Sequence, residues 1–451
     1  MLRRMRTDIL AEMERMAETY GDVAYVPIGR GAVFLRGHEA MRHVLVTEQD
    51  RYPKADVFQL FRPALGDGLV TSDGETWRTS RRMVQPMFAK RHLGAYAGHI
   101  TAASTEAVDR WAVRWQSDVV AIDQAILTVG LDTVGRALAS HDFTRDAERF
   151  EDAMGSSLTE IREMATSPLT HALQDLTTIG ITRLAQWTTP RRWRRYHEAV
   201  EVVDEMIAAL VDERLLNGHG DRDDLLRLLM ESTDPDSGEG LTRKQVMDEV
   251  KTLVAAGHET TAHGLSWMFH LLAQCPEAER RLHAEVDAVL GTGTVLTVEV
   301  VDEQLGWTAA CFKEAMRVIP PVWHLPRRAA VDDVIGGYRI PAGARVLPSI
   351  WATHRDPAVY ADPTVFRPER WLGDEPRLRP RFSYLPFGGG RRACVGQGFA
   401  MLNATILGAT IAHRFRFEAL PGTVASFEPT ITTRPRDPLF MRALPRVSTA
   451  S

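Results

Sequence analysis

One cysteine stands in a glycine-rich loop, residues 387–396, directly in front of a helical pattern. The successive glycines 388–390 let the backbone adopt positive φ angles and pass close to a bulky group. At the start of a helix, unpaired N–H groups and the helix dipole favour the thiolate form of Cys394, and Arg392 adds a positive charge two residues earlier. A thiolate in this setting is either a nucleophile or a metal ligand, and the alternative is a buried structural cysteine.

A second stretch combines an acid and an alcohol in the middle of a long helical pattern. Residues 242–274 have helical spacing, and they include Gly257, Glu259 and Thr260. Glycine and threonine are poor helix formers, and a threonine hydroxyl that bonds the carbonyl one turn back can bend a helix. Such a conflict between sequence and helix often marks a functional position. We interpret the neighbouring His258 as structural.

Together these stretches resemble the cytochrome P450 superfamily. In its heme-binding loop a cysteine is the proximal ligand of heme iron, and Cys394 stands at that position. The loop residues that match the motif at the right spacing are Phe387, Gly390, Arg392, Cys394 and Gly396. The resemblance therefore implies that Cys394 binds a metal and does not act as a nucleophile.

The resemblance also assigns roles outside the loop. In the family's oxygen-binding signature a small residue and a glycine leave room for O2, and an acid–alcohol pair delivers protons. The matching positions here are Ala256, Gly257, Glu259 and Thr260. Trp77 and Arg81 are four residues apart and share a helix face, and the family's matching pair binds a heme propionate. Arg327, with Arg328 beside it as the alternative, matches a second propionate-binding arginine.

A further pair of charges joins two distant parts of the chain. Glu314 and Arg317 are an i,i+3 pair, which on a helix surface is worth only about 0.2–0.5 kcal/mol. In the P450 family this Glu-x-x-Arg pair lies inward and meets an arginine of a later loop, and Arg370 stands at the matching position. The resemblance implies a buried structural network of Glu314, Arg317 and Arg370.

Apolar side chains between turn residues in the stretch 53–73 predict a loop without regular structure. The loop is either one wall of a binding site or a segment that packs only on itself. We expect the substrate pocket to include Phe58, Phe61, Leu65, Leu69, Ala255, Val322, Trp323 and Ile431. Such a lining predicts a lipophilic substrate, for example a terpenoid, a fatty acid or a polyketide-like molecule.

Elements that position these residues can be read from hydrophobic periodicity. Helical spacing covers residues 3–19, 37–47, 100–232, 302–318 and 394–413, besides 242–274, where Thr242 is the candidate N-cap. Hairpins are predicted at 23–35 and at 334–350, the second with its turn at 341–343. With the resemblance, this order predicts a mainly α fold with a small β-rich lobe, and heme between the long central helix and the cysteine loop. We expect one domain over 1–451, whose β-rich lobe takes in about 20–70, 325–350 and the C-terminal strands.

Composition sets further limits. The chain has 451 residues, 44% hydrophobic and 25% charged, as an ordinary globular protein has. A net charge of −5 argues against nucleic acid as the main partner. Three cysteines form no disulfide framework and suit a reducing compartment. The sequence has no run of about 18 apolar residues and no apolar stretch near its N-terminus that would suit a signal peptide, so we expect no transmembrane anchor and a cytoplasmic location.

The resemblance implies a heme-thiolate monooxygenase that inserts one oxygen atom of O2 into a lipophilic small molecule, with heme b as cofactor. Since the sequence contains no flavin or iron–sulfur pattern, electrons would come from a separate ferredoxin- or flavodoxin-type partner. Arg379, Arg381 and Arg391 could steer an acidic partner to the cysteine loop, and we expect a monomer. The alternatives are a peroxide-driven or rearranging heme-thiolate enzyme, a heme-binding sensor or carrier without turnover, and a cysteine-nucleophile hydrolase.

Overall fold

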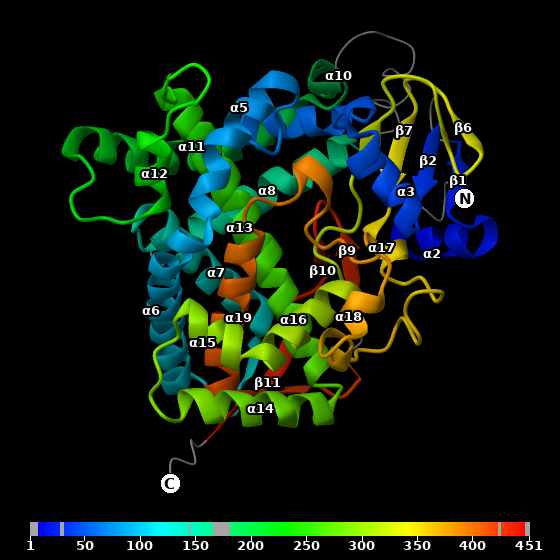
Figure 1. Cartoon of the computed structure of the whole chain (residues 1–451). Coiled ribbons are helices and arrows are strands. Elements are labelled where there is room, and N and C mark those ends of the chain that lie inside the picture. Colours follow the sequence, from blue (N-terminus) through cyan, green and yellow to red (C-terminus); the bar gives the residue numbers. More distant parts are fainter. Residues whose placement is uncertain (1–7, 28–30, 144–145, 166–180, 423–424, 447–451) are drawn as a thin grey trace.

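The computed structural model describes residues 8–27, 31–143, 146–165, 181–422 and 425–446. Its central element is helix α13 (Arg243–Leu272), which runs through the middle of the molecule (Figure 1). The helix begins at a capping box: the Thr242 hydroxyl accepts the Gln245 backbone N–H, and the Gln245 side chain accepts the Thr242 N–H. The predicted N-cap is therefore confirmed.

Further helices build the molecule around α13, which contacts α7, α11, α16 and α19 directly. On the N-terminal side of α13 in sequence they are α6 (Lys90–Arg114), α7 (Ile122–Ala139), α8 (Ala147–Ala165), α10 (Ile181–Thr188), α11 (Pro190–Asn217) and α12 (Leu225–Glu231). After α13 they are α14 (Pro276–Leu290), α15 (Val298–Gln304), α16 (Gly306–Val318) and α19 (Gln397–Arg414). Buried side chains of these helices form the main hydrophobic core, in which Trp267 and Phe312 are almost fully enclosed.

The strands of the described residues form four small sheets. The largest has the order β1-β2-β7-β4, with β2 parallel to β7 and the other pairs antiparallel. Its strands are β1 (Val23–Val26), β2 (Ala32–Leu35), β7 (Arg345–Pro348) and β4 (Arg327–Arg328). The others are β3 (Val119–Ala121) with β11 (Phe440–Pro445) and β8 (Phe415–Ala419), β5 (Asp333–Ile335) with β6 (Tyr338–Ile340), and β9 (Phe427–Pro429) with β10 (Thr433–Pro435). The four-stranded sheet lies on the right-hand side of Figure 1, where part of it shares a smaller core with α3 and η1, while Ala24, Val26, Ala32 and Phe34 belong to the main core.

Short elements connect the sheet to the helices near the cysteine loop. They are α2 (Ile9–Tyr20), α3 (His38–Arg42), the π-helical turn η1 (His43–Thr47), η2 (Gln49–Arg51), η3 (Asp56–Phe61), α4 (Arg62–Leu65), α5 (Gly74–Val84) and η4 (Gln85–Phe88). Later in the chain they are α17 (Ile350–Thr353), η6 (Pro368–Trp371), α18 (Glu375–Leu378) and η7 (Gly390–Arg392). The predicted mainly helical fold with small sheets is thus confirmed. Among the described helices, none combines the length and low charge needed to cross a bilayer.

Several element predictions need correction. The stretch 53–73 is not an irregular loop, because η3 and α4 occupy its middle. The helical stretch 302–318 is two helices, α15 and α16, and β3 is a strand inside the region predicted as nearly all helix. The hairpin predicted at 334–350 turns at Gly336 and Gly337, both with positive φ, so it ends at β6. Strand β7 instead joins β2 and β4 in another sheet. Part of the turn in the hairpin predicted at 23–35 and part of the helical stretch 100–232 lie outside the described residues.

Candidate active site

An interior cavity of about 1300 Å³ lies between α13, the cysteine loop 387–396, α5 and the segment 321–327. Most of its lining is apolar, with a few charged and hydroxyl side chains. Ligand pockets in proteins usually have about 300–1,000 Å³. The cavity therefore has room for a large cofactor together with a second molecule.

Backbone hydrogen bonds and one close approach hold the cysteine loop in shape. The Ala393 N–H donates to the Gly390 carbonyl over 3.1 Å, and the Cys394 N–H donates to the Phe387 carbonyl over 2.8 Å. Gly390 has φ +70°, and a Cβ at this position would lie 1.9 Å from the carbonyl oxygen of Leu45 in η1. Gly390 does not line the cavity. Because Gly390 has no side chain, the loop can pack directly against the π-helical turn η1. The close approach that this glycine allows is therefore to the protein backbone, and not to a molecule in the cavity.

The sulfur of Cys394 opens onto the cavity. Burial raises the pKa of this thiol, although the Gly396 N–H and the charge of Arg81 act in the opposite direction. The prediction that the loop by itself favours the thiolate is therefore wrong. The nearby positive charge belongs to Arg81, since Arg392 is held in an ion pair with Asp73. Coordination to a metal ion would still remove the thiol proton, because a ligating thiol is deprotonated outright.

Four cationic side chains line the part of the cavity near the cysteine loop: Lys54, Arg81, Arg327 and Arg392. Arg81 donates from Nη1 to the Ala393 carbonyl over 2.7 Å, and Arg392 lies 5.4 Å from the centre of the Trp77 ring. Arg327 is buried, and within the described residues its guanidinium makes one hydrogen bond, to the Pro326 carbonyl. Burial and the charge of Arg392 lower the pKa of Arg327 to about 10. Asp73 neutralises part of this positive charge through its ion pair with Arg392, and the remaining cationic groups suit a ligand that carries carboxylates.

The acid–alcohol stretch of α13 forms another wall. Ala256, Gly257, Glu259 and Thr260 all line the cavity. The Thr260 hydroxyl donates to the Ala256 carbonyl over 2.7 Å, as the sequence predicts, and α13 continues through this turn without a break. A Cβ at Gly257 would lie 3.4 Å from Val134 of α7. This is an ordinary van der Waals distance, so the packing of α7 on α13 does not itself require a glycine here.

Glu259 is tied to a second buried side chain. Its carboxylate lies 3.3 Å from Nε2 of His263, one turn further along α13. Burial acts to raise the pKa of Glu259, but the hydrogen bond and charge of His263 and the charges of His258 and Arg434 outweigh it and lower the pKa. His258 points away, with Nε2 3.1 Å from the Leu127 carbonyl, and does not line the cavity. This placement supports its interpretation as structural.

Comparison with known proteins decides the family. The cytochrome P450 family model matches residues 1–440. The chain belongs to the cytochrome P450 family. Cyclooctatin synthase of Streptomyces melanosporofaciens is 34% identical over 405 residues, which cover 90% of this chain and 84% of that protein. Pentalenene oxygenase of Streptomyces avermitilis is 32% identical over 407 residues, covering 89% and 85%. A crystal structure of the cytochrome P450DA heme domain matches with a TM-score of 0.86 at 25% identity and covers 98% of this chain and 94% of that one.

Family membership makes this protein a heme-dependent monooxygenase that uses O2 and needs a redox partner. The cavity of this P450 fits heme b. Its volume exceeds that of a usual ligand pocket, and the cationic cluster matches two propionates. Within the described residues no group of three or more His, Cys, Asp or Glu side chains could hold a free metal ion. A single sulfur in the wall therefore suits an iron that a macrocycle already binds.

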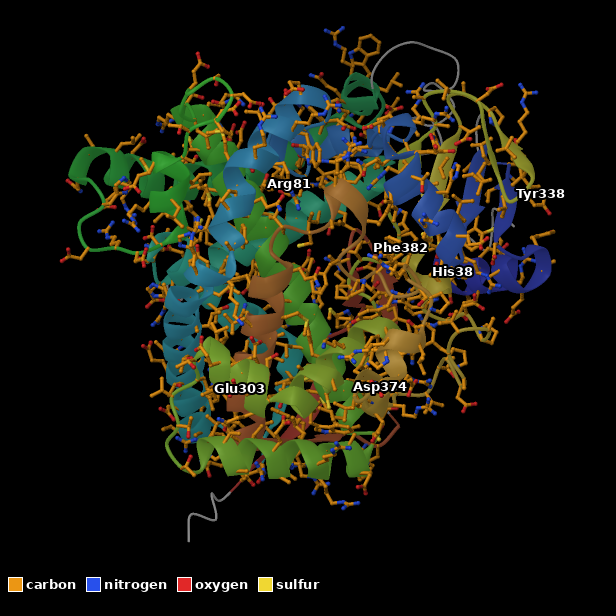
Figure 2. The ribbon with its side chains drawn as sticks, viewed as in Figure 1. His38, Arg81, Glu303, Tyr338, Asp374 and Phe382 are labelled. Carbon is orange, nitrogen blue, oxygen red and sulfur yellow. The ribbon has the colours of Figure 1, made fainter. Side chains whose placement is uncertain are left out.

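All the residues predicted for the substrate pocket line this cavity: Phe58, Phe61, Leu65, Leu69, Ala255, Val322, Trp323 and Ile431. Phe58 and Phe61 come from η3, and Leu65 ends α4, so short helices and not a loop provide this wall. The predicted heme-site residues Trp77, Arg81, Arg327, Phe387, Arg392, Cys394 and Gly396 line it as well. Figure 2 labels Arg81 on α5 and Tyr338 at the outer edge of the β-rich side. Arg328 is exposed and paired with Asp56, so of these two neighbouring arginines it is Arg327 that lines the cavity.

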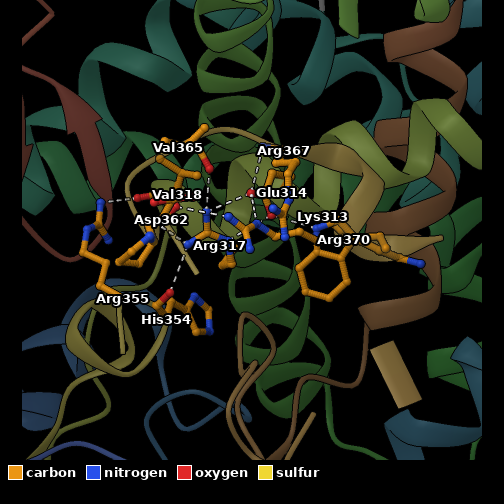
Figure 3. A network of polar contacts seen from close by, with 12 residues as sticks. Lys313, Glu314, Arg317, Val318, His354, Arg355, Asp362, Val365, Arg367 and Arg370 are labelled. Atoms are coloured by element: carbon orange, nitrogen blue, oxygen red, sulfur yellow. Dashed lines mark hydrogen bonds and ion pairs between the residues drawn. The ribbon is translucent and has the colours of Figure 1, made fainter. Parts of the chain in front are cut away.

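The Glu-x-x-Arg pair lies apart from the cavity lining, in the close-up of Figure 3. Glu314, Arg317 and Arg370 are almost fully buried. Glu314 Oε1 accepts Arg317 Nη2 over 2.8 Å and Arg370 Nε over 3.2 Å, and Oε2 accepts Arg317 Nε over 2.9 Å. Arg317 also donates to the carbonyls of Pro363 and Val365. The network joins α16 to η6 and to the chain before η6.

Sequence reasoning missed the side chains that fix the wall 65–72. The partly buried Lys54 donates from Nζ to three carbonyls there, those of Leu69, Val70 and Ser72, over 2.7–2.9 Å. Burial lowers the pKa of Lys54 to about 7. From α13, Asp248 accepts the Asp67 N–H and Glu249 accepts the Leu69 N–H. The signal in the sequence was a lone lysine in an apolar stretch, but its partners could not be inferred without the fold. Two histidines of the site, His263 and His324, were missed as well.

Proposed function

We propose that this cytochrome P450 inserts one oxygen atom into a cyclic, lipophilic substrate of the terpenoid class, with electrons from a separate redox protein. One observation carries the proposal: a single, mostly apolar cavity is lined both by the Cys394 loop and by the Glu259–Thr260 pair of α13. A sulfur ligand and a proton-delivering pair around one apolar space are what oxygen insertion into a C–H bond requires.

The proposed roles follow from position. When heme is bound, Cys394 would supply its sulfur to the iron, and the loop residues Phe387, Gly390, Arg392 and Gly396 would shape its surroundings. Trp77, Arg81 and Arg327 would hold the propionates, and Ala256 and Gly257 would leave room for O2. When bound, the heme supplies the reduction of O2 and the transfer of oxygen to the substrate. Overall, one C–H bond, one O2, two electrons and two protons give one alcohol and one water.

The chain itself must supply the two protons inside an apolar cavity. Because its pKa is low, Glu259 is ionised at neutral pH and can only pass on a proton that it has first received. His263 is the described neighbour that hydrogen-bonds its carboxylate. The Thr260 hydroxyl donates to the Ala256 carbonyl, which leaves its oxygen lone pairs free to accept and hold a water molecule. We propose that protons pass from Glu259 through such a water beside Thr260.

Electron delivery is proposed to come from a ferredoxin- or flavodoxin-type protein that docks near the cysteine loop. Of the three arginines that we expected to guide this redox protein, one does not have the required exposure. The Arg379 side chain is only 7% exposed and packs on the rings of Tyr360 and Trp371, so it belongs to the fold. Arg391 is exposed but paired with Asp50, and Arg381 is exposed.

The sparse, odd set of cysteines, which suits a reducing compartment, supports a cytoplasmic location.

The terpenoid class is supported by the relatives and by the cavity. Two of the similar proteins are named cyclooctatin synthase and cyclooctat-9-en-7-ol 5-monooxygenase, each 34% identical to this chain, and a third is pentalenene oxygenase. Phe58, Phe61, Leu65 and Leu69 give this cavity an apolar wall that short helices hold in place. A wall of this kind suits a rigid ring system, which loses little conformational entropy on binding.

Titration of the heme absorption band with a compound panel tests the substrate class. The panel contains cyclic terpenoids, fatty acids and macrocyclic polyketides, each added to the purified holoenzyme. We expect saturable band shifts with cyclic terpenoids at the lowest concentrations. A response to fatty acids or polyketides alone would overturn the terpenoid class, and no response at all would argue against a small lipophilic substrate.

Thr260→Ala should separate consumption of reductant from formation of product. The variant keeps the cavity, so reductant consumption should continue, but the water beside residue 260 loses its hydroxyl partner. A loss of about 1.4 kcal/mol at the proton transfer is a tenfold effect, so product per reductant should fall about tenfold while hydrogen peroxide rises. Thr405→Ala is the matched control, because its hydroxyl makes the same bond one turn back, 2.7 Å to the Met401 carbonyl, away from the cavity. Equal coupling ratios in the two variants would place the proton path elsewhere.

A further inference from the structure

One wall of the cavity carries a histidine that the proposed reaction does not use. His324 lies in the segment between α16 and β4, and its ring lines the cavity. The ring stacks on Trp323, with centroids 3.7 Å apart and an interplanar angle of 29°. The Trp323 indole N–H in turn donates a 3.0 Å hydrogen bond to the Thr430 carbonyl. The backbone of His324 forms an antiparallel β-bridge with that of Ser349. The imidazole is therefore held in a fixed place.

This imidazole has no hydrogen-bond partner among the described residues. Its Nδ1 is fully enclosed and unpartnered, and no described side chain or backbone group bonds Nε2. Burial alone lowers the pKa of His324 to about 3, so the ring is neutral and carries one N–H. An enclosed N–H without an acceptor is rarer in proteins than an enclosed acceptor without a donor. The proton therefore belongs on Nε2, the nitrogen that a molecule in the cavity can reach.

A second polar atom lies on the same wall. The chain at residues 430–433 runs beside the segment of His324, since the Thr433 N–H donates to the Pro321 carbonyl over 2.8 Å. Thr432 lines the cavity, and its hydroxyl is also buried without a partner among the residues that the structure describes. Buried polar atoms nearly always have a partner in a working protein. The Thr432 hydroxyl is as enclosed as Nδ1 of His324, so Nε2 of His324 is the polar atom that this part of the apolar wall offers to a molecule in the cavity.

We propose that His324 donates a hydrogen bond from Nε2 to an oxygen atom that the substrate already carries, and so selects an oxygenated substrate over the matching hydrocarbon. A hydroxyl or a carbonyl oxygen can accept this bond. The inference rests on the proposed function and narrows its substrate class to terpenoids that already carry an oxygen atom. A water-quenched cyclisation or an earlier oxygenation must then supply the substrate.

Matched ligand pairs test this preference. Each pair consists of a cyclic terpenoid alcohol and its deoxygenated hydrocarbon, for example cedrol and cedrane, and dissociation constants come from shifts of the heme band. We compare wild type with His324→Phe, which keeps an aromatic ring, and with His324→Gln, which keeps an N–H donor. In His324→Phe the preference for the alcohol should fall roughly 3- to 10-fold, the usual effect of one hydrogen bond, while hydrocarbon affinity stays within about twofold. His324→Gln should restore part of the preference.

Two further measurements keep the outcomes apart. Heme content and melting temperature are recorded for every variant, since His324 could instead serve the cofactor. Loss of heme in His324→Phe, or an unchanged alcohol preference with normal heme, would overturn the inference and leave the proposed function intact. If no terpenoid of any pair shifts the band of the wild-type protein, the proposed substrate class fails, and this inference fails with it.

Discussion

Glu314→Ala should leave little folded protein at physiological temperature. The substitution removes the one carboxylate shared by two buried guanidinium groups, those of Arg317 and Arg370. Breaking a buried charge pair by removing one partner costs about 3–5 kcal/mol, because the remaining charge is left in a medium of low polarity. The free energy of unfolding of a whole domain is only about 5–15 kcal/mol. One substitution could therefore use up most of the stability of this protein.

More than the ion pair depends on this carboxylate. Glu314 also accepts the Arg367 backbone N–H over 3.0 Å and the Trp371 indole N–H over 2.9 Å. These bonds fix η6 on α16, and η6 precedes the segment that leads into the cysteine loop. We therefore expect Glu314→Ala to lower heme content as well as the melting temperature. Arg317→Ala should act in the same way, because Glu314 would keep only Arg370 as its cationic partner.

A matched surface pair provides the control. Glu75 and Arg78 have the same i,i+3 spacing on α5, but their side chains are 68% and 48% exposed. Exposed pairs contribute about 0–1 kcal/mol, so Glu75→Ala should leave both the melting temperature and the heme content close to wild type. Thermal and denaturant unfolding of the two variants measure the difference. Similar melting curves for Glu314→Ala and Glu75→Ala would contradict the structural role of the buried network.

Features that depend on one local element could be predicted from the sequence. Trp77 and Arg81 face the same cavity because four residues make about one helical turn. Thr242 caps α13 because a hydroxyl at that position satisfies free N–H groups of the first turn. The back-bond of Thr260 to Ala256 has the same local origin. For such residues, the type and spacing of a few neighbours decide the geometry.

Features that depend on distant partners could not be predicted. Arg392 seemed a neighbour of the thiol in sequence, but Asp73, more than three hundred residues earlier, holds its guanidinium. Strand β7 follows a plausible turn, yet its pairing is decided by β2 from the start of the chain. His324 looks like any residue of an extended segment until its unpartnered ring is seen in the cavity wall. Burial by tertiary contacts, and not local pattern, decides the chemistry of these groups.

Cys394→Ser should abolish the spectral signature of a sulfur-bound heme. The hydroxyl of serine does not ionise at neutral pH, and it donates far less electron density to iron than a thiolate does. The substitution changes one atom, and the loop keeps its backbone bonds, including the one from residue 394 to the Phe387 carbonyl. We therefore expect the polypeptide to fold as before, with weaker heme binding and a ferrous carbon-monoxide band displaced from the wild-type position.

Cys275→Ser is the matched control for the chemical change. Cys275 is partly buried just before α14 and does not line the cavity, so this variant should keep the wild-type band and heme content. Circular dichroism of both variants, recorded beside the band position, separates loss of the ligand from loss of the fold. An unchanged band in Cys394→Ser would mean that another group binds the iron. Loss of the band in both variants would mean that it does not report on Cys394, because Cys275 lies outside the cavity in this fold.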